Sequence, residues 1–66
     1  MGKVRRGGYV FEWWIGDHPP RHVHVSDSNG KLLGRMAVET MQPIDPWRPL
    51  RKVLEIIEEL QKEGRL

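Results

Sequence analysis

The stretch RHVHVSDSNGKLLGRMAVE, residues 21–39, decides the fold of this chain. Asn29-Gly30 is a strong hairpin signal because both residues accept the positive φ angles of a type I′ turn. Before the turn, apolar and polar residues alternate, which is the pattern of a half-buried strand. We therefore predict two antiparallel strands, residues 21–26 and 31–39, joined at Asn29-Gly30.

The turn also predicts which residues face each other across the two strands. With Asn29-Gly30 at its centre, His24 faces Arg35, His22 faces Ala37 and Ser26 faces Leu33. Side chains on a strand alternate between the two faces of the sheet, so each face can be listed. The predicted core face carries Val23, Val25, Leu32, Met36 and Val38, and the opposite face carries His22, His24, Leu33, Arg35, Ala37 and Glu39.

Residues 9–15 predict one further strand, because aromatic and β-branched residues dominate them. The odd positions from Tyr9 to Ile15 are all apolar and form its core face, which places Glu12 and Trp14 on the other side.

After a loop, Leu50, Val53, Leu54, Ile57 and Leu60 recur at helical spacing. This stripe predicts a helix over residues 46–63, capped by Asp45 with two prolines in its first turn. The expected fold is α+β: a three-stranded antiparallel β-meander, residues 9–39, with one C-terminal helix packed on one face.

Size and charge narrow the class of protein. The chain has 66 residues, a net charge of +2 and no cysteine, which predicts a single domain with a small core and no disulfide or thiolate site. Residues 1–8 hold three basic residues and no acidic one, and we expect them to form a flexible basic arm. No apolar run is long enough for a membrane span, so we expect a cytoplasmic protein.

All three histidines lie in residues 17–24, DHPPRHVH. His22 and His24 point to the same face of a strand, close enough for both rings to bind one metal ion. The candidate metal ligands are His18, His22 and His24, and a divalent metal such as zinc is the cofactor that they suit. In an alternative without metal, His22 or His24 acts as general base and Arg35 steadies an anionic transition state. The histidines can equally be structural, lining a polar sheet face.

The face opposite the helix carries apolar side chains among its polar ones. One helix covers only one side of a sheet, so this second side is left uncovered. We expect a second copy of the chain or a small protein partner to pack there. The candidate contact residues are Trp14, Leu33, Arg35 and Ala37.

The motif around the histidines resembles a family of very small bacterial proteins catalogued as domain of unknown function 4160. The resemblance covers about residues 8–60, and its signature positions are Asp17, His18, Pro19, His22 and His24. The chain departs from the family pattern at residues 45–49, DPWRP. The family has no established activity, but its members often sit beside another small gene, in an arrangement that resembles toxin–antitoxin modules.

The resemblance therefore implies a component of a toxin–antitoxin-like module that acts by binding a partner protein. Two alternatives come from the residues themselves. One is a small metal-dependent or histidine-based hydrolase, such as a ribonuclease. The other is a nucleic-acid-binding module that uses the basic N-terminal arm.

Overall fold

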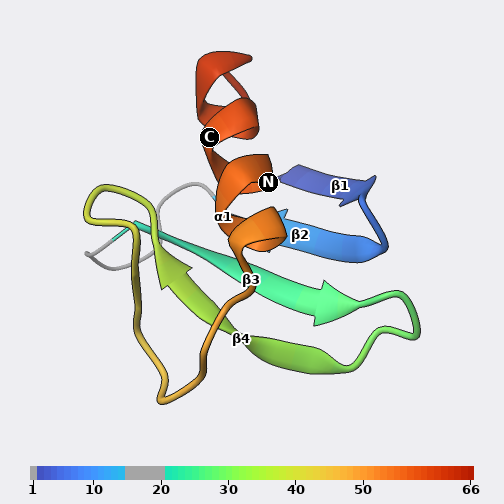
Figure 1. Cartoon of the computed structure of the whole chain (residues 1–66). Helices are drawn as coiled ribbons and strands as arrows, with labels where there is room; N and C mark the ends of the chain where they lie inside the picture. Colours follow the sequence, from blue (N-terminus) through green and yellow to red (C-terminus); the bar gives the residue numbers. More distant parts are fainter. Residues whose placement is uncertain (1, 15–20) are drawn as a thin grey trace.

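The computed structural model describes residues 2–14 and 21–66 and shows an antiparallel sheet with one helix across it (Figure 1). The sheet has five strands in the order of the chain. They are β1 (Gly2–Arg6), β2 (Tyr9–Trp13), β3 (His22–Asp27), β4 (Leu32–Ala37) and β5 (Gln42–Pro43), and the helix is α1 (Arg51–Lys62). The α+β class and the C-terminal helix are thus confirmed, whereas the number of strands was predicted as three.

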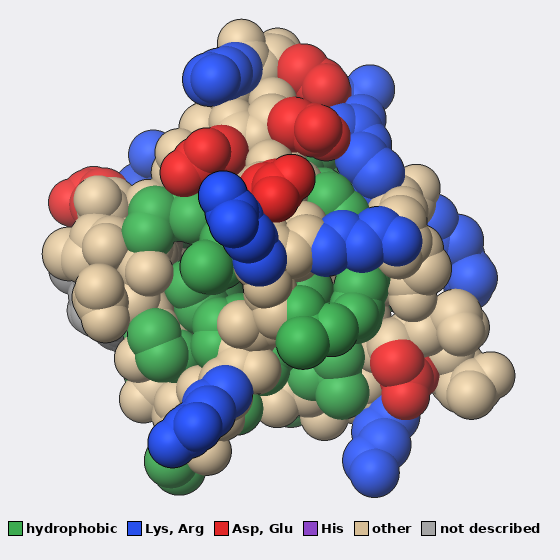
Figure 2. Space-filling view, viewed as in Figure 1, with side chains coloured by type: hydrophobic (Ala, Val, Ile, Leu, Met, Phe, Trp, Pro, Cys, Tyr) green, Lys and Arg blue, Asp and Glu red, His purple; other side chains and the backbone are tan. Residues whose placement is uncertain are grey.

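The core lies between α1 and one face of the sheet. Phe11, Val23, Val25 and Met36 of the sheet are all completely buried there, because strand alternation turns these side chains toward the helix. From α1, the buried residues are Val53, Ile56, Ile57 and Leu60, at helical spacing. In the space-filling view, charged side chains of both signs cover α1 and apolar side chains show on either side of it (Figure 2).

The prediction of a flexible arm over residues 1–8 was wrong for Gly2–Arg6, which form β1 and pair with β2. Val4 faces Phe11 and is buried. Arg6 reaches the C-terminal end of α1, where it donates to the C-cap residue Glu63 at 2.9 Å. A buried valine and an ion pair to the helix hold this segment in the sheet.

The hairpin between β3 and β4 has the predicted register at His22 and His24, but its turn differs from the predicted one. His24 faces Arg35 and His22 faces Ala37, as predicted. The turn, however, closes from Gly30 N–H to the Asp27 carbonyl, and Gly30 alone has a positive φ, so it is not type I′. This turn makes Ser26 face Leu32 instead of Leu33. A register shift between Val25 and Ser26 then restores the predicted pairing.

The helix begins at Arg51 rather than at residue 46, and Asp45 does not cap it. Its N-cap is Leu50, which makes no side-chain capping bond. Residues 45–47 are held against β4 instead, because the Asp45 carboxylate accepts hydrogen bonds from Arg35 and the Trp47 indole donates to the Arg35 carbonyl. These contacts fix a non-helical segment ahead of α1.

Trp47 lies directly over Gly34 in β4. A Cβ atom added to Gly34 would come within 2.5 Å of three atoms of the Trp47 ring. The absence of a side chain at position 34 is therefore what lets the indole pack flat against the sheet.

We predict that Gly34→Ala lowers the free energy of unfolding by about 1–3 kcal/mol, the usual cost of overpacking a core. The measurement is urea unfolding of the wild type and the variant. In a Trp47→Ala background the same substitution should cost clearly less, since the atoms that it meets are gone. Equal costs in both backgrounds would contradict this packing.

Candidate functional site

The face of the sheet turned away from α1, called the open face below, carries the residues singled out by sequence. The register defines its central row, in which Lys3, Glu12, His24 and Arg35 face each other in turn across β1 to β4. Their chain neighbours Val4, Phe11, Val23 and Val25 point to the helix side and are buried. The predicted placement of the histidines opposite Val23 and Val25 is therefore confirmed.

Three aromatic rings gather at one end of the open face. The His22 and His24 rings have centroids 5.1 Å apart and are tilted by 53°. Trp14 lies edge-on to His24, with centroids 4.8 Å apart and planes at 86°. The side chain of Trp14 stays 40% exposed. This cluster thus joins two titratable rings to a large apolar surface that solvent can reach.

Arg35 and Asp45 form the main ion pair of the site. The Arg35 Nη2 and Nε donate to the two Asp45 oxygens at 2.8 and 3.1 Å, and the Arg35 backbone N–H donates to Asp45 Oδ2 at 3.1 Å. The hydrogen bonds from Arg35 hold the pKa of Asp45 below its ordinary value, and the positive fields of Arg35 and His24 act in the same direction. The same pair raises the pKa of Arg35.

This ion pair bears on the histidine-based mechanism. His24 does lie beside Arg35, as predicted. Two of the guanidinium nitrogens are already bound to Asp45, so much of the charge needed to steady an anion is neutralised. This role of Asp45 could not be recognised from the sequence, because a carboxylate just before a helical stripe is the usual sign of an N-cap.

The two leucines of β4 extend the apolar part of the open face. Leu32 faces Ser26 and Gly34 faces Val25, so Leu33 is an extra residue in β4. Such a bulge changes the direction of the side chains around it. Leu32 is 54% exposed and Leu33 is 36% exposed. The prediction of Leu32 as a core residue was therefore wrong.

The four candidate partner-binding residues differ in the surface that they offer. Trp14 and Leu33 are accessible, and the Arg35 side chain is 39% exposed. Ala37 is only 6% exposed, since β5 pairs alongside it and Met41 N–H donates to its carbonyl. Of the apolar candidates, Trp14 and Leu33 are thus accessible to solvent, and Leu32, which was not a candidate, adds a third exposed apolar side chain.

His18, the third candidate metal ligand, lies outside the described residues. Among residues 2–14 and 21–66, no group of three His, Asp or Glu side chains is arranged to hold a metal ion. The His22 and His24 rings are close enough to share one ion at about 2 Å from each nitrogen. A zinc site that includes them stays a prediction.

Comparison with known proteins finds no matching family model, no matching curated protein and no matching solved structure. The resemblance to the small bacterial family therefore stays an expectation from the motif. In the part of the chain that the structure describes, no helix is long and apolar enough to cross a membrane.

If the histidines bind zinc, the metal should raise the melting temperature in a dose-dependent way at pH 8, because it binds only the folded state. The shift should fade as the pH drops below about 6.5, where imidazole takes up protons. The double variant His22→Ala/His24→Ala should fold and show no shift. Calorimetry of the wild type with no shift at pH 8 would remove the metal hypothesis.

We predict that the ion pair of Asp45 makes stability depend on pH in acid. A carboxylate whose pKa is lowered by folding stabilises the protein above its unfolded pKa, which is about 3.8 here. This stabilisation is lost as the pH falls through the lower pKa of the folded state. The difference in free energy of unfolding between wild type and Asp45→Asn should therefore shrink below this pH.

The control for this prediction is the Arg35→Gln background, in which the main cause of the lowered pKa is absent. Asp45→Asn should there have a smaller effect that varies less with pH. Urea unfolding at a series of pH values measures all four proteins. An unchanged effect of Asp45→Asn across the acid range would show that the ion pair contributes nothing.

Proposed function

We propose that this chain is a small binding module, one component of a toxin–antitoxin-like pair, and that it holds a partner protein on the open face of its sheet. The resemblance of the histidine motif to the small bacterial family supports the proposal of a toxin–antitoxin-like pair. The surface chemistry of the open face supports the mode of action.

The single observation that carries the proposal is the exposed apolar group on the open face. Trp14, Leu32 and Leu33 are each at least 36% exposed, although burying a side chain of this size is favourable by about 1.5–3 kcal/mol. Arg35 lies between the two ends of this group, opposite His24. Tryptophan and arginine are the residues most often found at the energetic centre of protein interfaces.

The charge of the open face indicates the chemistry of the partner. Lys3, Arg5 and Arg35 are its basic residues, and the acidic groups nearest to them in the register and contacts are Glu12 and Asp45. The excess is positive, so a partner that presents an apolar patch with acidic groups around it is complementary. A symmetric contact between two copies would bring this positive patch against itself, which favours a different protein over a second copy.

The test is binding of the product of the neighbouring gene, measured by calorimetry after separate purification. Trp14→Ala and Leu33→Ser should each weaken binding by about 2 kcal/mol or more, the range of interface hot spots. Both residues are exposed, so the variants should keep the melting temperature of the wild type within a few degrees.

The matched control is Leu50→Ser. Leu50 is 62% exposed and precedes α1, away from the open face, so this variant should bind as the wild type does. Equal losses at Leu50 and Leu33, or no binding by the wild type, would overturn the proposal. Light scattering that finds a stable dimer with Trp14 in its interface would replace the partner by a second copy.

A further inference from the structure

The two sides of the sheet differ in how their outermost backbone groups are bonded. On the β4 side, the Arg35 N–H donates to the Asp45 carboxylate at 3.1 Å, and the Arg35 carbonyl accepts from the Ile44 N–H at 2.9 Å. The Ala37 carbonyl accepts from the Met41 N–H at 3.0 Å. Next to β4 lies β5, which has two residues, one of them a proline without an N–H. This side therefore offers few backbone groups to a further strand.

The other side of the sheet ends at β1 (Figure 1). Gly7 and Gly8 have φ angles of 64° and 86°, and Arg6 faces Tyr9 across them, which fits a two-residue turn of type I′. The residues that flank such a turn form a hydrogen-bonded pair. Along an antiparallel ladder, hydrogen-bonded pairs alternate with pairs that are not hydrogen-bonded. The turn therefore determines which residues of β1 are bonded to β2.

This alternation directs the backbone N–H and C=O groups of Lys3 and Arg5 away from β2, whereas the even-numbered residues of β1 are bonded to it. Continued through β2 and β3, the same alternation makes Arg35 and Ala37 the outward residues of β4, in agreement with their bonds. In the part of the chain that the structure describes, no backbone group bonds to the outward groups of β1. β1 thus presents one side of an unfilled ladder.

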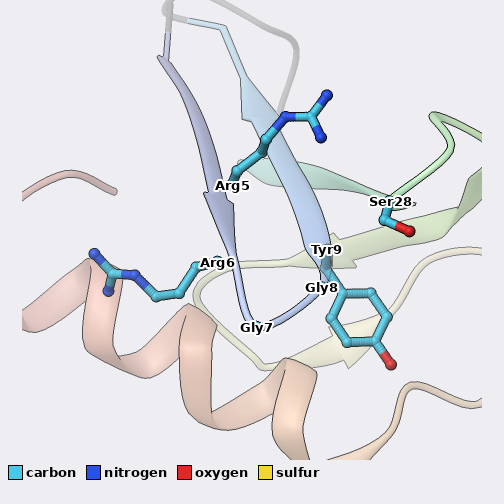
Figure 3. A pocket seen from close by; sticks show the side chains of 6 residues that line it. All are labelled: Arg5, Arg6, Gly7, Gly8, Tyr9 and Ser28. Atoms are coloured by element: carbon cyan, nitrogen blue, oxygen red, sulfur yellow. The ribbon is translucent and has the colours of Figure 1, made fainter.

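The side chains of Lys3 and Arg5 give this edge a positive charge. Both residues are exposed, and their positions in β1 place them on the open face. Figure 3 shows Arg5 directed away from α1, whereas Arg6 reaches toward the helix. Across the pair of strands, Lys3 faces Glu12 and Arg5 faces Val10. Glu12 therefore offsets part of the charge of Lys3, and Arg5 has no acidic residue opposite it.

We infer that the β1 edge binds an extended acidic segment of another protein as an additional antiparallel strand. The backbone of this segment bonds to Lys3 and Arg5, and acidic residues at alternate positions face the two cations. A second copy of β1 would place like charges directly opposite each other, which destabilises a strand pair. The inference does not rest on the proposed function, since Trp14, Leu32 and Leu33 take no part in it.

The probe is a short acetylated peptide in which threonine and glutamate alternate, added to the full chain. Amide hydrogen exchange followed by NMR reports on each backbone N–H. The peptide should slow exchange at Lys3 and Arg5, whose N–H groups gain a partner. It should change exchange little at Val4 and Arg6, which are already bonded to β2. The same peptide with lysine in place of glutamate should protect neither residue.

Methylated peptides separate strand addition from attraction between charges. In an antiparallel strand, the residues opposite Lys3 and Arg5 direct their own N–H groups at β1. A peptide methylated on the glutamate nitrogens should therefore lose binding. One methylated on the threonine nitrogens, which point away from β1, should keep it. The two peptides have the same charge, so equal affinities would overturn the inference.

Variants of the protein test the same contacts from the other side. Arg5→Ala should weaken binding about threefold, as expected for one cross-strand charge pair. The matched control is Arg48→Ala, which removes the same charge from an exposed position ahead of α1. Lys3→Pro should weaken binding more than Lys3→Ala, because both remove the charge and only proline removes the outward N–H. Unchanged exchange at Val4 and Arg6 shows that β1 remains folded in these variants.

Slowed exchange at Lys3 and Arg5 that requires glutamate in the peptide would support the inference. Two results in the protein would overturn it. One is unchanged exchange at both amides of the wild type with millimolar peptide. The other is an equal loss of affinity in Arg5→Ala and Arg48→Ala, which would mean that the peptide responds only to the net charge of the protein.

Discussion

A twelve-residue helix can cover only one face of the sheet, and this constraint shapes the molecule. The side chains that meet α1 from the sheet, such as Phe11 and Val25, are completely buried. The other face must then present whatever its alternate positions carry, which here are imidazoles, an indole, leucines and basic residues. The alternation of side chains along each strand therefore determines both which residues form the core and which residues form the open face.

The contacts between β4 and residues 45–47, which precede α1, determine where that helix lies. Asp45 is bound to both the side chain and the backbone of Arg35, and Trp47 is seated on Gly34. Gln61, near the other end of α1, donates to the Val38 carbonyl at 2.9 Å. The helix is therefore attached to the β4 region at both of its ends. Arg35 thus has two roles, because it binds the segment that precedes α1 and its side chain lies on the open face.

Sequence patterns were informative where the chemistry is local. Alternation of valine with histidine predicted the faces of β3 correctly. The pairing of His24 with Arg35 was also predicted correctly, but in the structure it results from a different turn together with a register shift between Val25 and Ser26. The turn type did not follow from Asn29-Gly30, because the Asp27 carboxylate accepts hydrogen bonds from Asn29 N–H and Lys31 N–H at 2.9 Å. A side chain outside the dipeptide thus selected another turn. β1 was missed since Val4 is its only buried residue, and the role of Asp45 because its partner lies ten residues away.

The strand order has a consequence for how the chain folds. Every strand pairs with its neighbour in sequence, so each step of sheet formation closes only a short loop, and short loops close at small entropic cost. Contacts distant in sequence arise mainly when α1 docks, as in the pair of Arg6 with Glu63, 57 residues apart. From its low contact order we expect a topology of this kind to fold fast for a sheet protein.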